Sequence, residues 1–107
     1  EKIEDCCKRH SALGERCHTL LSRLGKSECD PPALGMALSR AGTELKLTAD
    51  GSDRHIAEMM ADGANTGMKS LARHLNDCRD ATPESRVLAY ELIREEQGFY
   101  SDMLKFL

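Results

Sequence analysis

Cysteine, histidine and glutamate recur at helical spacing in this 107-residue sequence, and these residue types bind metals or carry acid–base chemistry. Cys6 and His10 lie one helical turn apart, and Cys17 follows on the same face. A thiolate and an imidazole at this spacing can share a zinc ion, but a closed tetrahedral site needs further ligands. The candidates for these are Cys7, Cys78 and Glu96. The alternative is packing, with His10 as a core histidine held by a polar partner.

Glu96 stands among apolar residues that recur at helical spacing near the end of the chain. An ionised carboxylate without a partner would be costly there, so Glu96 should pair with a cation or turn toward an opening. The candidate cations are His10, Arg73 and His74. The metal candidates are therefore Cys6, His10, Cys17 and Glu96. We assign no catalytic residue and predict no cofactor, because no nucleophile, base and orienting group form a recognisable set.

A carboxylate-bridged di-iron centre would require two Glu-x-x-His motifs on facing helices, together with a glutamate from each of two others. Only Glu15 and His18 have this spacing, and His18 lies off the apolar stripe of its helix. Neither Glu91 nor Glu95 has a histidine three positions later. The sequence therefore disfavours an intact di-iron centre.

The composition describes one helical domain, with 40% hydrophobic residues, 31% charged residues and no Trp. The net charge of −3 comes from mixed charges without a basic block, so we expect no nucleic-acid partner. No apolar run approaches the length of a membrane span and no leader precedes the first helical pattern, so we expect no membrane partner. Five cysteines without a CxxC pair predict free thiols and a cytoplasmic location.

The first helix is predicted over about 2–24, because apolar residues alternate at steps of three and four, and Gly25 provides a stop. The seam consists of Ile3, Cys6, His10, Leu13, Cys17, Leu20 and Leu24. The opposite face should be in solvent; it carries Lys8, Arg9, Glu15, Arg16 and Ser22. A short second helix should follow Asp30-Pro31-Pro32 and reach about half the length of the others. Its apolar face comprises Leu34, Leu38, Ala41 and Leu45.

A third helix is predicted over about 53–78, capped by Ser52 or Asp53. Gly63 and Gly67 lower the helix propensity of this segment, but its apolar residues keep the same helical phase throughout, which favours one continuous helix. The two glycines leave a smooth strip where a neighbouring helix can approach closely. The stripe comprises Ile56, Met60, Ala64, Gly67, Leu71, Leu75 and Cys78. Thr82-Pro83 begins a fourth helix that should run to the C-terminus. Its stripe comprises Leu88, Leu92, Glu96, Phe99, Met103 and Phe106.

The run from His55 to Gly67, the Thr82-Pro83 start, the segment Leu92-Ile93-Arg94-Glu95-Glu96 and the ending Leu104-Lys105-Phe106-Leu107 resemble an uncharacterised bacterial family of ferritin-like four-helix bundles. The resemblance covers mainly the second half of the chain. It implies a ferritin-like fold and adds no activity, because the family has none established. Family members carry a further helix ahead of the matched part, which we expect to be absent here.

These features predict an all-α, ferritin-like, up-and-down bundle over residues 1–107, with three long helices and one short crossover helix. Three long amphipathic helices leave a gap that the short helix, a segment before Glu1 or another subunit could fill. We expect a homodimer, because an apolar face would otherwise lie in water. The predicted function is non-enzymatic, through self-association or binding of a partner helix. The alternative is a degenerate ferritin-like metal-binding or redox protein.

Overall fold

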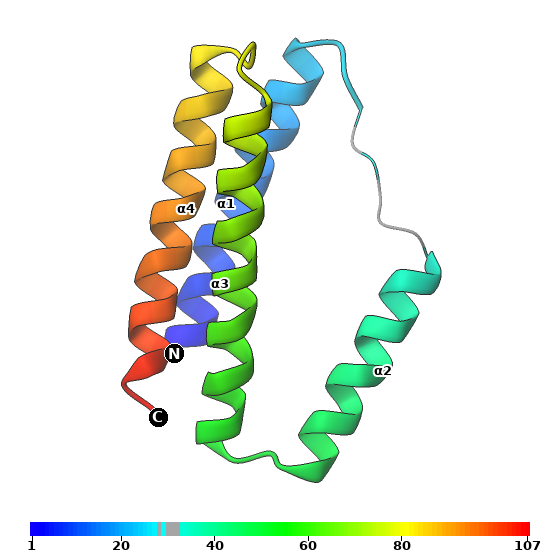
Figure 1. Cartoon of the computed structure of the whole chain (residues 1–107), viewed down its shortest axis with the longest axis vertical. Helices are drawn as coiled ribbons and strands as arrows, with labels where there is room; N and C mark the ends of the chain where they lie inside the picture. Colours follow the sequence, from blue (N-terminus) through cyan, green and yellow to red (C-terminus); the bar gives the residue numbers. More distant parts are fainter. Residues whose placement is uncertain (28, 30–32) are drawn as a thin grey trace.

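The computed structural model describes residues 1–27, 29 and 33–107, which form four helices and no strand. The helices are α1 (Lys2–Arg23), α2 (Ala33–Ala49), α3 (Asp53–Asp77) and α4 (Pro83–Leu104), and they alternate in direction along the chain (Figure 1). This confirms the all-α prediction. The predicted helix start at Asp30-Pro31-Pro32 lies outside the described residues. None of the described helices is long and apolar enough to cross a membrane.

The helix ends follow the local signals in the sequence. Gly25 adopts a φ of +66°, and the N–H of Lys26 donates to the Leu21 carbonyl at 2.9 Å, which closes α1 as a glycine-stopped helix does. The Ser52 hydroxyl accepts from the backbone N–H of His55 and caps α3. The Thr82 hydroxyl caps α4 in the same way, with Pro83 at the first helical position. These predicted boundaries are confirmed, except that α4 ends at Leu104 instead of continuing to the C-terminus.

α3 is one continuous helix of 25 residues despite Gly63 and Gly67. Packing on α4 compensates the poor helix propensity of the glycines, because most helical stability in proteins comes from tertiary burial. The predicted stripe is confirmed at Ala64 and Leu75, which are 4% and 8% exposed, but other buried residues of α3 were not on it. Ala57 and Ala61 are 3% and 5% exposed, whereas Ile56 and Met60 are only partly buried. The small alanine side chains allow α3 and α4 to approach closely, and the larger side chains lie to one side.

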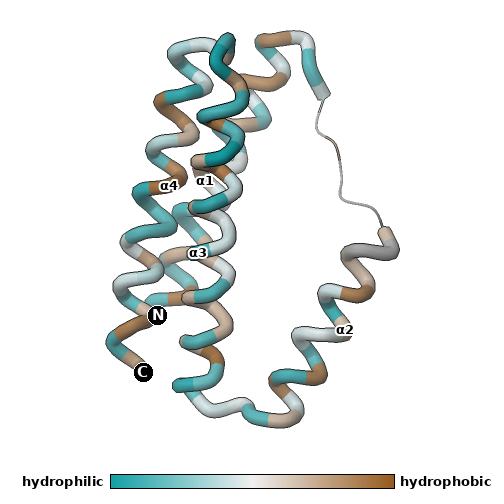
Figure 2. Tube along the Cα trace, in the orientation of Figure 1, coloured by the Kyte–Doolittle hydropathy of each residue, from teal (hydrophilic) through white to brown (hydrophobic). Residues whose placement is uncertain are grey.

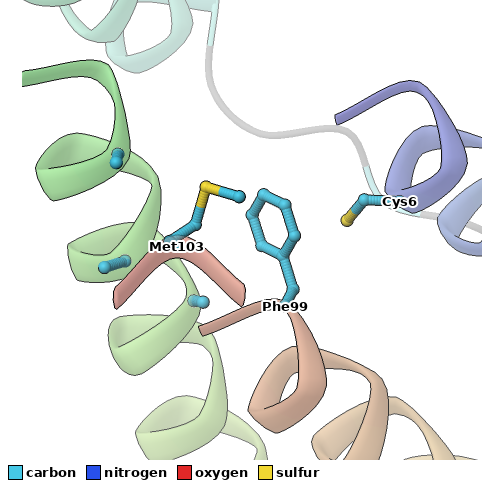
Figure 3. Close-up of a cluster of buried hydrophobic side chains, with 6 residues drawn as sticks. Cys6, Phe99 and Met103 are labelled. Carbon is cyan, nitrogen blue, oxygen red and sulfur yellow. The ribbon is translucent and has the colours of Figure 1, made fainter. Parts of the chain in front are cut away.

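The core lies between α3, α4 and the first turns of α1. Phe99 and Met103 of α4 are 5% and 3% exposed, and Figure 3 shows the Phe99 ring between Met103 and Cys6. Residues at the ends of the predicted stripes are instead exposed, because no helix covers them there. These exposed residues are Ile3, Leu24, Cys78 and Phe106.

α1 packs on α4 through an antiparallel row of ion pairs that the sequence reading missed. Its basic residues recur every seven positions, at Lys2, Arg9, Arg16 and Arg23. Their partners on α4 are Asp102, Glu95, Glu91 and Glu84, respectively. Arg9 and Arg16 are exposed, as predicted, but the prediction did not include their ion pairs with α4. Each exposed pair contributes little to stability, but four pairs together favour a single register of α1 on α4.

α2 lies apart from the other three helices and makes no extensive contact with them (Figure 1). It has 17 residues and spans about 25 Å, so the predicted half-length is too short. Apolar and polar residues are interspersed along it (Figure 2). Leu38 and Leu45, which belong to its predicted apolar face, are 66% and 72% exposed. Among the described side chains of α2, the leucines of this face are therefore left in solvent.

Candidate functional site

The candidate site is a groove between α1 and α3 with α4 as its floor, which we call the α1–α3 groove. Since α1 and α3 both pack on α4, a four-helix bundle would place its remaining helix here. In up-and-down order that helix is α2, which lies elsewhere in this structure (Figure 1). The groove is therefore the position that the fold leaves open.

Two hollows follow the length of the α1–α3 groove. The first, of about 310 Å³, lies between the N-terminal halves of α1 and α3 and is lined mainly by apolar side chains. Its lining includes Ile3, Cys7, His10, Met59, Met60 and Gly63. The second, of about 270 Å³, lies near the C-terminal end of α1 and is lined by leucines from three helices. Its lining includes Cys17, Leu21, Leu24, Leu71, Leu88 and Leu92. Both hollows of the groove are thus mainly apolar, with His10 and Glu96 as the polar exception in the first.

Gly63 and Gly67 differ in what surrounds them. A Cβ built on Gly63 would meet no atom within 4 Å, so this position of the groove wall is open. A Cβ on Gly67 would lie 3.8 Å from the Glu96 side chain, which is ordinary van der Waals contact. We expected a neighbouring helix to approach closely at both glycines. α4 does so at Gly67, whereas Gly63 faces open space.

His10 and Glu96 form a polar pair on the wall and floor of the groove. His10 Nε2 lies 2.6 Å from Glu96 Oε1, and His10 Nδ1 lies 3.0 Å from the carbonyl oxygen of Cys6. The hydrogen bond to Glu96, opposed by burial and reinforced by the Cys6 carbonyl, raises the pKa of His10 above its usual 6.5. This confirms that Glu96 takes a cationic partner, and it selects His10 from the three candidates. Arg73 and His74 are exposed.

Cys6 packs against this pair from the core side. Its Sγ lies 3.2 Å from His10 Nδ1, and the residue is 6% exposed. Burial, followed by the charges of Glu95 and Glu96, raises the pKa of the Cys6 thiol above 9.0. A catalytic Cys–His pair requires the opposite shift, toward thiolate, so this geometry favours packing over nucleophilic chemistry.

The four metal candidates do not converge on one point. Cys17 lies eleven residues after Cys6 on the same helix, hence about 16 Å along the axis. Cys6 Sγ and the Glu96 carboxylate approach different nitrogens of the His10 ring. The group of donor atoms within 4.8 Å of one another is instead Cys6, His10 and Glu95.

The sequence reading did not select Glu95 as a ligand. The signal that points to it is the seven-residue spacing of the basic residues on α1, which places Arg9 opposite Glu95 and turns that carboxylate toward α1. Glu95 is therefore already paired with a cation. A metal ion would have to compete with Arg9 for the carboxylate and with protons for Cys6 and His10.

All five cysteines have free thiols, as expected from their spacing. Cys7, Cys29 and Cys78 are exposed. Comparison of the chain with known protein families, with curated proteins and with solved structures gives no match. The α1–α3 groove and the polar cluster within it are therefore the features of this chain that indicate a function.

Proposed function

We propose that this protein is a non-enzymatic, ferritin-like helical bundle that acts through self-association, with a second copy of the chain covering the α1–α3 groove. The observation that carries the proposal is the pair of mainly apolar hollows along this groove, together with a helix whose described leucines are exposed. Soluble monomers rarely leave large contiguous apolar surfaces in water. Five free thiols support a reducing compartment, so the proposal includes a cytoplasmic location.

Gly63 provides a test, because its position is open within the chain. The substitution Gly63→Arg places a long charged side chain in the groove, at a position where the added Cβ meets no neighbour within 4 Å. It also removes a helix-interior glycine, which should favour α3 by up to about 1 kcal/mol. The variant should therefore fold at least as well as the wild type but lose self-association.

Gly98 offers a matched control on α4. It is exposed and also has no atom within 4 Å of a built Cβ, but it lines neither groove hollow. The mass of the wild type, Gly63→Arg and Gly98→Arg should be measured by light scattering over a range of concentrations. We expect the wild type and Gly98→Arg each to have a mass above the 11.9 kDa of one chain. Gly63→Arg should have the mass of one chain. A wild type that is monomeric at micromolar concentration contradicts self-association. If the groove binds a helix of another protein and no second copy of this chain, binding of a partner helix replaces self-association as the proposed function.

The second candidate is a degenerate metal-binding or redox protein. The proximity of the Cys6, His10 and Glu95 donor atoms favours it. Because Cys6 and His10 both hold their protons more tightly than usual, zinc binding should strengthen as the pH rises. Metal analysis of protein purified without a His tag tests this candidate. Stoichiometric zinc that is lost in His10→Ala would establish the metal site and displace the first proposal.

A further inference from the structure

Each chain offers one open groove and one helix whose large apolar side chains, among the described residues, are exposed. The hollows of the α1–α3 groove are lined mainly by apolar side chains. On α2, Leu38 and Leu45 lie on one face, and Met36 and Leu47 lie on the opposite face. One groove and one free helix per chain make the surface self-complementary, which is the requirement for a closed two-fold dimer.

The dimensions and direction of α2 suit this groove. Its length of about 25 Å fits within the roughly 33 Å of α1 and 37 Å of α3. Leu38 and Leu45 are seven residues apart and thus lie on the same helical face. A helix seated antiparallel to both α1 and α3 completes the alternating order of a four-helix bundle.

α2 and the rest of the chain carry opposite net charges. α2 has Arg40, Lys46 and Glu44, which give it a net charge of +1, so the rest of the chain has a net charge of −4. Glu96, which lines the groove, is already paired with His10, and Glu95 is paired with Arg9 on the other side of α1. The opposite net charges therefore favour the encounter between α2 and a second molecule, whereas apolar burial has to supply the binding in the groove.

We infer that α2 of one copy occupies the α1–α3 groove of a second copy and that the exchange is reciprocal. This inference rests on the proposed function and names the segment that performs the self-association. It follows from the position of α2, which lies away from its own groove and leaves both surfaces free at once (Figure 1). Each half of the dimer is then a complete four-helix bundle with three helices from one chain and one from the other.

Complementation between two variants tests the exchange. The first variant carries Leu38→Asp and Leu45→Asp, so its groove is intact but its α2 is not apolar. The second carries Gly63→Arg, so its α2 is intact but its groove is blocked. All three positions are exposed within the chain, so both variants should retain the helical circular dichroism of the wild type. Each alone should sediment as a monomer of 11.9 kDa, and an equimolar mixture should recover a species of twice that mass.

A disulfide experiment separates exchange between chains from closure within one chain. α2 ends near the start of α3, on the same side of the molecule as the N-terminal half of α1, which carries the exposed Cys7 (Figure 1). Leu45→Cys in a chain whose Cys29 and Cys78 are replaced by serine should therefore oxidise with Cys7 of the second copy. A covalent dimer on a non-reducing gel supports the exchange, and a disulfide within one chain overturns it.

The outcomes distinguish this inference from the proposed function. If Gly63→Arg abolishes self-association but the Leu38→Asp, Leu45→Asp variant associates like the wild type, the groove binds another part of the second copy. The α2 exchange is then overturned while self-association through the groove stands. If the wild type is monomeric with α2 cross-linked to its own groove, both are overturned.

Discussion

The His10–Glu96 pair allows a quantitative test of how α1 is held on α4. The Glu96 side chain is 16% exposed and that of His10 is 33% exposed, so water reaches the pair only in part. Replacing His10 by leucine leaves the Glu96 carboxylate without its partner. A hydrogen bond to a charged group contributes about 1.5–3 kcal/mol, and partial exposure reduces this, so we expect a loss of about 1–2 kcal/mol in the free energy of unfolding.

The double substitution of His10 and Glu96 by leucine should behave differently from either single substitution. Replacing both partners of a buried pair by apolar groups is close to neutral or stabilising. We therefore expect the double variant to unfold within about 1 kcal/mol of the wild type. For a chain of this size, a loss of 1 kcal/mol corresponds to a decrease of about 5 °C in Tm.

The contribution of the pair should also depend on pH in a defined direction. The pKa of His10 is raised above 6.5 in the folded chain by the hydrogen bond to Glu96. A group with a raised pKa stabilises the fold fully below its unfolded value and loses this effect as the pH rises through the folded value. The wild type should therefore lose stability relative to the double variant as the pH rises from the ordinary value of 6.5 through the raised pKa of His10.

Urea unfolding followed by far-UV circular dichroism is the suitable assay, because the chain has no Trp for fluorescence. Measurements at submicromolar concentration separate folding from association. The wild type, both single variants and the double variant form a double-mutant cycle. If the loss in the double variant equals the sum of the two single losses at about pH 6, His10 and Glu96 are not coupled and the proposed pair does not exist.

Three further predictions follow from burial and backbone geometry. Phe99→Ala should destabilise the fold by about 3–5 kcal/mol, measured by urea unfolding, because the ring fills the core between α1, α3 and α4; a loss below about 1 kcal/mol would contradict this core. Gly25→Ala should cost about 1 kcal/mol in the same assay, because alanine is strained at a φ of +66°, and an unchanged midpoint would argue against this helix stop. Cys7 should react with a thiol reagent in the folded monomer, whereas Cys6 should react only after unfolding; equal rates would place Cys6 at the surface.

Much of the local structure was accessible from the sequence. Gly25, Ser52 and Thr82 mark helix ends because their effects depend on the backbone within a few residues. The expectation that Glu96 takes a cation also needed only the cost of an unpaired carboxylate among apolar residues. The choice of His10 among three candidates required coordinates, since the two residues are 86 positions apart.

The sequence was less informative about which helical faces meet. It placed Ile56 and Met60 on the buried stripe of α3, but the close contact with α4 uses Ala57 and Ala61. Apolar burial is non-directional, so a stripe of large side chains does not specify the partner or the angle of approach. The ion pairs between the basic residues of α1 and the acids of α4 could not be predicted in the same way. A charged residue beside the apolar stripe of a helix has the same sequence spacing whether it faces another helix or only solvent.

By itself, the sequence determined that this chain forms four helices and where α1 ends and α3 and α4 begin, because helix formation and capping depend on neighbouring residues. Only the tertiary structure decided that α1 and α3 both pack on α4, that α2 lies apart, and that a long apolar groove remains open. The physical reason is that packing between distant helices depends on shape, register and charge across the whole molecule. None of these is encoded in the periodicity of any single helix.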